Sequence, residues 1–129
     1  MDTSVVIDFP AARVAEVADE VALSAVTIGE LQYGVTAAAD PLVQMHRRQR
    51  LQAILDRFDV LPFDVTAAEY YGALASLVRQ YGRNPRPRRM HLQIAATAAH
   101  HGLTLLTRNS GDFTGLDSAL AVVEVPDPK

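Results

Sequence analysis

Three acidic residues stand where predicted strands give way to helices or turns, and they are the first candidates for chemistry. Asp2 opens the stretch DTS, Glu30 lies one to two turns into a predicted helix, and Asp112 follows the apolar run LTLLT. Carboxylates that converge on one edge of a fold repel one another, and a hard cation such as Mg²⁺ relieves that repulsion through oxygen ligands. Such a cation can activate water for phosphodiester hydrolysis.

Each acid also has a purely structural interpretation. Glu30 stands three residues after Thr27, which is the spacing of a helix capping box. Asp112 follows Gly111 and is a residue type that often caps turns, while Asp2 lies beside the chain terminus, where acids are commonly just solvated. No single acid therefore indicates a metal site by itself. The prediction of such a site depends on the elements that would bring all three acids together.

The apolar pattern predicts alternating strands and helices within one domain, residues 1–129, long enough to bury a core. Helices are expected over residues 10–20, 27–38, 41–57, 66–81 and 90–102, and strands over 21–24, 59–63, 103–107 and 121–125. A Thr66-x-x-Glu69 capping box opens the fourth helix. This alternation indicates an α/β fold with a mostly parallel sheet covered by helices on both faces. Ligands of such sheets sit beyond the carboxyl ends of the strands.

Composition excludes several classes of protein. Cysteine is absent, which excludes disulfides and thiolate metal sites. No apolar run approaches the roughly 18 residues of a membrane span, and no signal peptide is visible, so we expect a cytoplasmic protein. The only lysine is Lys129. Receiver-type and haloacid-type phosphotransfer domains also place acids at strand ends, but they need a basic partner that is usually lysine, so they are disfavoured.

A basic segment interrupts a chain whose net charge is −3. Residues 79–89 contain five arginines and no acid. Such a segment could follow an RNA backbone or meet an acidic partner protein, and Arg86, Arg88 and Arg89 are the candidates for RNA binding. The alternative is a solvated loop in an arginine-rich chain. Aromatic residues make up only 6% of the sequence, so base stacking is not expected to dominate.

Three motifs together resemble the PIN-domain ribonucleases, and more narrowly the VapC toxins of VapBC toxin–antitoxin pairs. They are DTSVVID at the start, S-x-x-T-x-x-E-L over residues 24–31, and a stretch over residues 91–113 with IAATA, GLTLLT and N-x-x-D-F. The resemblance covers essentially the whole chain. It implies a three-layer α/β/α fold with about five strands and a Mg²⁺- or Mn²⁺-dependent endoribonuclease. It also implies a homodimer that a small VapB-type antitoxin silences in its active-site groove.

The resemblance assigns roles by position. Asp2, Glu30 and Asp112 would be the metal-site acids and catalytic residues. Thr107 and Asn109 would be the polar residues that orient a carboxylate or a water.

One position departs from the family pattern. The residue three before the isoleucine of IAATA is normally an acid that helps to hold the metal, and here that residue is His91, three before Ile94. Replacing a carboxylate by neutral imidazole should weaken Mg²⁺ binding more than Mn²⁺ binding, because Mn²⁺ accepts nitrogen better. A protonated His91 near a helix N-terminus would repel the metal, so we expect it to be neutral when metal is bound.

Several interpretations of His91 stay open. The chain could be an impaired or metal-dependent nuclease, a natural variant still active through Asp2, Glu30 and Asp112, or a form engineered to silence a toxic enzyme. The alternative function is a catalytically weak PIN domain that acts as an RNA-binding or antitoxin-binding module.

The start of the chain is a second departure. Family members have several apolar residues before DTS that form the central strand, whereas only Met1 precedes Asp2 here. Either the true start lies upstream, or the strand is rebuilt from TSVVI, residues 3–7. In the family arrangement Thr3 and Ser4 would support the turn after the first strand.

Two further groups of side chains receive plainer interpretations. His100 and His101 are adjacent, so we expect them to point to different sides of the helix and not to form a chelating pair. Tyr70, Tyr71 and Leu74 are expected to form core or dimer surface rather than a ligand pocket.

Overall fold

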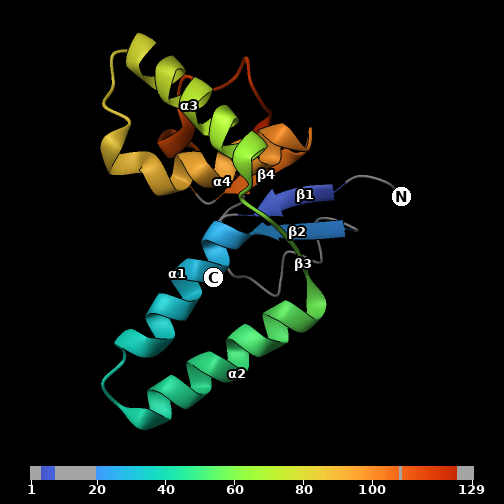
Figure 1. Cartoon of the computed structure of the whole chain (residues 1–129), viewed down its shortest axis with the longest axis vertical. Coiled ribbons are helices and arrows are strands. Elements are labelled where there is room, and N and C mark those ends of the chain that lie inside the picture. Colours follow the sequence, from blue (N-terminus) through green and yellow to red (C-terminus); the bar gives the residue numbers. More distant parts are fainter. Residues whose placement is uncertain (1–3, 8–19, 108, 125–129) are drawn as a thin grey trace.

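The computed structural model describes residues 4–7, 20–107 and 109–124 (Figure 1). Its strands are β1 (Ser4–Ile7), β2 (Glu20–Ser24), β3 (Asp59–Leu61), β4 (Thr104–Thr107) and β5 (Val122–Glu124). Its α-helices are α1 (Ala25–Ala37), α2 (Pro41–Arg57), α3 (Val65–Gln80) and α4 (Arg89–His100). Two short 3₁₀ turns, η2 (Arg86–Arg88) and η3 (Ser110–Phe113), flank α4 and β4. Of the helix expected over residues 10–20, all but the last residue lies outside the described part, and Glu20 begins β2.

The strands form one parallel sheet in the order β3-β2-β1-β4-β5. The central strand, β1, pairs on both sides, so that Val6 lies opposite Ala22 of β2 and Leu105 of β4. The expected α/β class is confirmed. Because all neighbouring strands run the same way, Ser24, Thr107 and Glu124 end their strands at the same edge of the sheet. That carboxyl edge is where a ligand site is expected.

The helices gather into two pairs (Figure 1). Helices α1 and α2 form a hairpin on one side of the view, and α3 and α4 pack together on the other. Helix α4 supplies much of the core, with Leu92 and Ile94 packed among Val6, Leu74 and Leu105. Burying an aliphatic side chain of this size contributes about 1.5–3 kcal/mol, so this packing holds α4 firmly against the sheet. Its first turn is thereby fixed near the carboxyl edge.

The first described strand lies within TSVVI, the stretch that the sequence offered as a possible strand. Strand β1 begins at Ser4, so Asp2 precedes β1 in the chain and does not follow it. Ser4 likewise lies in the strand and not in a turn after it. Asp2 and Thr3 themselves lie outside the described residues.

Both expected capping boxes are wrong, because an earlier residue caps each helix. Ser24 caps α1, its Oγ accepting a hydrogen bond of 3.0 Å from the Val26 N–H. Asp64 caps α3, its Oδ1 accepting a hydrogen bond of 2.9 Å from the Ala67 N–H. A polar residue just before the first helical residue satisfies free N–H groups directly. The capping role, which was the structural alternative to a functional role for Glu30, is therefore excluded.

The strand expected over residues 59–63 ends at Leu61. Pro62 follows, and proline has no N–H to continue a ladder of hydrogen bonds.

Among the side chains that the sequence assigned to core or dimer surface, Leu74 is 1% exposed and belongs to the core, and Tyr71 packs against that core. Tyr70 is 39% exposed. In the described part of the chain, no helix is long and apolar enough to cross a bilayer.

Candidate functional site

The pair formed by His91 and Asp112 is the centre of the candidate site. His91 lies in the first turn of α4 and Asp112 in η3, and Nε2 of the imidazole stands 3.6 Å from Oδ2 of the carboxylate. Their side chains are 42% and 27% exposed, so both groups remain open to a ligand. The imidazole also lies edge-on to the ring of Phe113, with centroids 5.8 Å apart and planes at 84°. Phe113 is only 2% exposed, so the imidazole packs against a buried ring that restricts its movement.

The turn that carries Asp112 is organised by Thr107 and Asn109. Thr107, at the end of β4, is 1% exposed and its Oγ1 accepts a hydrogen bond of 3.1 Å from the Asn109 N–H. Asn109 in turn caps η3, its Oδ1 accepting a hydrogen bond of 3.2 Å from the Gly111 N–H. The interpretation of Asp112 as a simple turn cap is thus wrong, because Asn109 performs that role. The Asp112 side chain is turned toward His91 instead.

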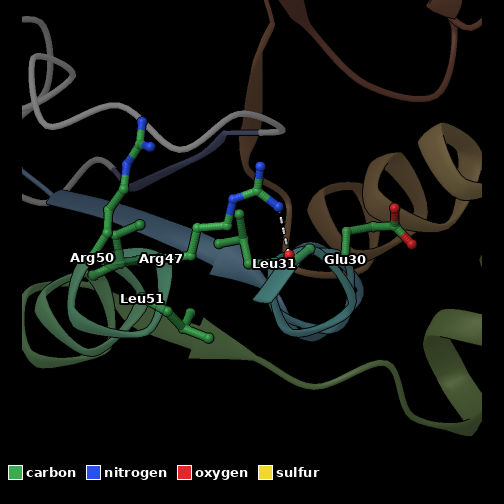
Figure 2. Close-up of a pocket in the computed structure, with 7 residues that line it drawn as sticks. Glu30, Leu31, Arg47, Arg50 and Leu51 are labelled. Atoms are coloured by element: carbon green, nitrogen blue, oxygen red, sulfur yellow. Dashed lines mark hydrogen bonds between the residues drawn. The ribbon is translucent and has the colours of Figure 1, made fainter. Parts of the chain in front are cut away.

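Glu30 occupies a different place. It is exposed on α1 and lines a pocket of about 180 Å³ between α1 and α2, together with Leu31, Gly34, Arg47, Arg50, Leu51 and Ile54. Figure 2 shows its carboxylate pointing away from Arg47 and Arg50. Arg47 donates from Nη1 to the carbonyl oxygen of Gly34 over 2.6 Å, which ties the two helices together.

The described acids and histidines do not gather into one complete cage. Within residues 4–7, 20–107 and 109–124, no three His, Asp or Glu side chains are close enough to share an ion. His91 and Asp112 are brought together, Glu30 stands apart on α1, and Asp2 is outside the described residues. The described part of the site therefore consists of one pair and one separate carboxylate.

The donors of this site suit some divalent cations better than others. One carboxylate and one imidazole suit Mn²⁺ or another transition ion better than Mg²⁺, which prefers oxygen. On the α1 side, Thr27 is 4% exposed and its hydroxyl has no hydrogen-bond partner among the described residues. A buried unsatisfied hydroxyl commonly marks a place for a water or an ion. Among the described residues the site thus offers one nitrogen and one oxygen donor side by side, a pair that suits a metal accepting both.

The arginine segment borders this site. Arg86 and Arg88 lie in η2, and Arg89 begins α4 two residues before His91. Arg83 donates from Nη1 to the carbonyl oxygen of Gly111 over 3.1 Å, which joins the segment to η3. The segment therefore places positive charge beside Asp112.

Sequence reasoning missed a carboxylate that holds the same turn. Glu124 ends β5 beside Thr107. Its Oε1 accepts hydrogen bonds from the Oγ of Ser110 at 2.6 Å and from the Ser110 N–H at 3.1 Å. These hydrogen bonds stabilise the ionised form and lower the pKa of Glu124. Only the register of β4 with β5 brings this residue to η3, so no local motif could have identified it.

The paired histidines at the other end of α4 differ from their expectation. The ring centroids of His100 and His101 lie 4.4 Å apart, because His101 is the C-cap and is no longer directed by helical geometry. His100 stands 3.9 Å from Oδ1 of Asp64. The pKa of Asp64 is lowered, first by the Ala67 N–H and also by the nearby histidines. The expectation that the two rings point apart is therefore wrong.

Comparison with known proteins adds the context for this geometry. The family model described as PIN domain matches residues 1–117. Ribonuclease VapC5 of Mycobacterium tuberculosis is 37% identical over 125 residues, which cover 95% of this chain and 90% of that protein. Toxin FitB of Neisseria gonorrhoeae is 35% identical over 105 residues, covering 79% of this chain and 74% of the toxin.

Solved structures show the same fold. The crystal structure of VapBC-5 from Mycobacterium tuberculosis, a member of the VapBC family of toxin–antitoxin systems, matches with a TM-score of 0.78 at 32% identity. That match covers 98% of this chain and 100% of the other. The structure of FitAcB from Neisseria gonorrhoeae matches with a TM-score of 0.76 at 30% identity, covering 95% and 97% of the two chains.

Proposed function

This chain belongs to the PIN-domain family, and from that premise we propose that it is the toxin of a toxin–antitoxin pair and cleaves RNA as an endoribonuclease. The names of its relatives support both parts of the proposal, since VapC5 is a ribonuclease and FitB a toxin. The observation that carries the chemistry is the His91–Asp112 pair at the carboxyl edge of a parallel sheet.

Several finer features follow from the same premise. We propose the three-layer α/β/α form of the PIN fold with its sheet of about five strands, as a single domain over residues 1–129. The relatives seen in complex with antitoxins support a VapB-type antitoxin as partner. We further propose a homodimer, and the cytoplasm as the place of action because the proposed substrate is cellular RNA.

The proposed catalytic machinery combines described and undescribed residues. Asp112, His91 and Glu30, with Asp2, would hold Mg²⁺ or Mn²⁺. The cation would supply a Lewis acid that activates water and stabilises the charge developing on the scissile phosphate. The support for this set is the His91–Asp112 pair near the end of β4 and the resemblance of the four positions to the family motifs, while Glu30 stands apart from the pair in the structure.

The protein's own contribution is positioning. Thr107 and Asn109 hold the turn in which Asp112 faces His91, so the carboxylate is oriented before substrate arrives. Arg86, Arg88 and Arg89 would bind the RNA backbone on the α4 side, where their charge offsets that of the phosphates. Phe113 packs behind His91 and keeps the imidazole at the edge of the sheet.

The test is direct. Purified protein is incubated with a mixed RNA substrate in Mn²⁺, in Mg²⁺ and in EDTA, and the new RNA ends are sequenced. We expect internal cleavage in Mn²⁺, slower cleavage in Mg²⁺ and none in EDTA. Cleavage that continues unchanged in EDTA would contradict the metal-dependent mechanism.

The second candidate function is a catalytically weak PIN domain that binds RNA or antitoxin. The imidazole of His91 at a position where the family has an acid favours it. RNA binding measured by fluorescence anisotropy, with no new ends in any metal, would support the binding module. Metal-dependent cleavage that Asp112→Asn abolishes would support the enzyme.

A further inference from the structure

We infer that Glu124 is a positioning residue for Asp112: it anchors the η3 turn to the end of β5 and so holds the Asp112 carboxylate against His91. The catalytic meaning of this anchor rests on the proposed function, but the anchor itself does not. Glu124 lies 14 residues after Ser110 and contacts η3 from the end of β5, so the anchor comes from outside the turn itself.

The contact between Glu124 and Ser110 is well suited to fix orientation. A single carboxylate oxygen, Oε1, accepts both the backbone N–H and the side-chain hydroxyl of Ser110, at 3.1 Å and 2.6 Å. Hydrogen bonds to a charged acceptor are shorter and about twice as strong as neutral ones. Two donors from one residue also restrict its rotation. Ser110 lies two residues before Asp112, so its orientation passes directly along the turn.

A second anchor, the positively charged Arg83, holds Gly111, the residue after Ser110. The carbonyl oxygen of Gly111 accepts hydrogen bonds from Arg83 Nη1 at 3.1 Å and from Thr114 Oγ1 at 2.9 Å. The backbone just before Asp112 is thus attached to β5 through Glu124 and to the loop after α3 through Arg83. The turn is held from two separate parts of the fold.

These anchors matter because, besides the hydrogen bonds of Thr107 and Asn109, the turn has little of its own to define it. A 3₁₀ turn of four residues has poor internal hydrogen-bond geometry. The Asp112 N–H bonds to the carbonyl oxygen of Asn109 at 3.2 Å, and Ser110 and Gly111 are half-buried and exposed. A ligand carboxylate must be held within about 0.5 Å of its working position to bind a metal well. Outer residues that orient ligands therefore affect metal affinity.

The experiment compares Glu124→Ala with Glu124→Gln. The glutamine keeps an oxygen that accepts hydrogen bonds, whereas alanine keeps none. Glu69→Ala, on the exposed face of α3, is the matched control for loss of a surface carboxylate. Three quantities are measured: hydrogen exchange of the amides of residues 110–113, the NMR resonances of the His91 ring, and Mn²⁺ affinity by electron paramagnetic resonance.

We expect Glu124→Ala to raise the exchange rate of the Ser110 amide by about tenfold, since one charged hydrogen bond is lost. The His91 ring resonances should shift, and Mn²⁺ affinity should fall by roughly tenfold, as for other outer residues of metal sites. Glu124→Gln keeps a neutral oxygen that accepts hydrogen bonds, so each change should be clearly smaller than in Glu124→Ala, and Glu69→Ala should show none. If Glu124 only stabilised the fold, the melting temperature would fall. A shift of the His91 resonances at an unchanged melting temperature therefore indicates positioning.

The outcomes separate two failures. Unchanged exchange and unchanged His91 resonances in Glu124→Ala would overturn the positioning role. Glutamine that changes all three quantities as much as alanine would also overturn it, because an oxygen acceptor at this position would then not be what holds the turn. If the resonances shift as expected while the wild-type protein binds no Mn²⁺, the positioning role stands and the metal-dependent nuclease falls.

Discussion

The two sides of the candidate site differ in how firmly the fold holds their carboxylates. On the α4 side, Asp112 sits in a turn that Thr107, Asn109, Arg83 and Glu124 hold by side-chain hydrogen bonds. On the α1 side, Glu30 is exposed at the rim of a pocket in a hairpin of two helices. The comparison teaches that one half of the site is set by the fold, while the other half projects into solvent and is free to adjust to a ligand.

The largest effect is expected from breaking the rigid side. Asp112→Asn keeps the shape of the side chain but removes the charge of the carboxylate that faces His91. We expect RNA cleavage in Mn²⁺ to fall by about 100-fold or more, because a charged ligand group is lost from a preorganised site. Asp117→Asn, an exposed carboxylate five residues later, is the control. Equal cleavage by the two variants would remove Asp112 from the site.

A smaller loss is expected from the α1 side. Glu30→Gln should reduce cleavage by roughly tenfold, because water can replace an exposed carboxylate ligand more easily than a fixed one. Mn²⁺ affinity measured by calorimetry should fall in parallel, and Glu69→Gln should change neither quantity. If Glu30→Gln costs more than Asp112→Asn, the ranking of the two sides is reversed.

The metal preference can be sharpened at His91. His91→Asp restores an oxygen ligand beside Asp112, and we expect Mg²⁺-dependent cleavage to rise about tenfold. Without metal the two carboxylates repel, so the melting temperature in EDTA should fall and Mg²⁺ should raise it again. His91→Asn, which adds no charge, should show neither change. Identical rates in Mg²⁺ for His91→Asp and the wild type would contradict this account.

The smallest effect is expected at Thr27. Its hydroxyl is buried without a described partner, so Thr27→Val should raise the free energy of unfolding by about 1 kcal/mol in EDTA. If the hydroxyl serves a water or an ion beside Glu30, Mn²⁺ should stabilise the variant less than the wild type. Urea unfolding with and without Mn²⁺ measures both. Thr36→Val, at an exposed position of the same helix, is the control.

Much of the fold was predictable because apolar periodicity reflects burial. The α/β class and the approximate helices follow from it, and α4 with its buried face is the clearest case. The helix starts were not predictable to the residue, since Ser24 and Asp64 compete as caps with Thr27 and Thr66, and the choice depends on where the preceding strand or loop ends. The end of β3 follows from Pro62 in retrospect.

The candidate site was only partly accessible from sequence. The pattern named His91 and Asp112, which the structure places 3.6 Å apart. It did not name Glu124 or Arg83, because their hydrogen bonds to η3 depend on strand register and on the path of a loop. Spacing along the chain carries no information about such distant partners.

The position of β1 has a consequence for the order of synthesis. The ribosome translates β1 well before its partner β4, because β2, β3 and four α-helices lie between them in the chain. Pairing between segments so remote in the chain is slow and must wait for the later one. The nascent polypeptide therefore has no completed sheet, and no assembled corner around Asp112, until β4 and β5 have been translated.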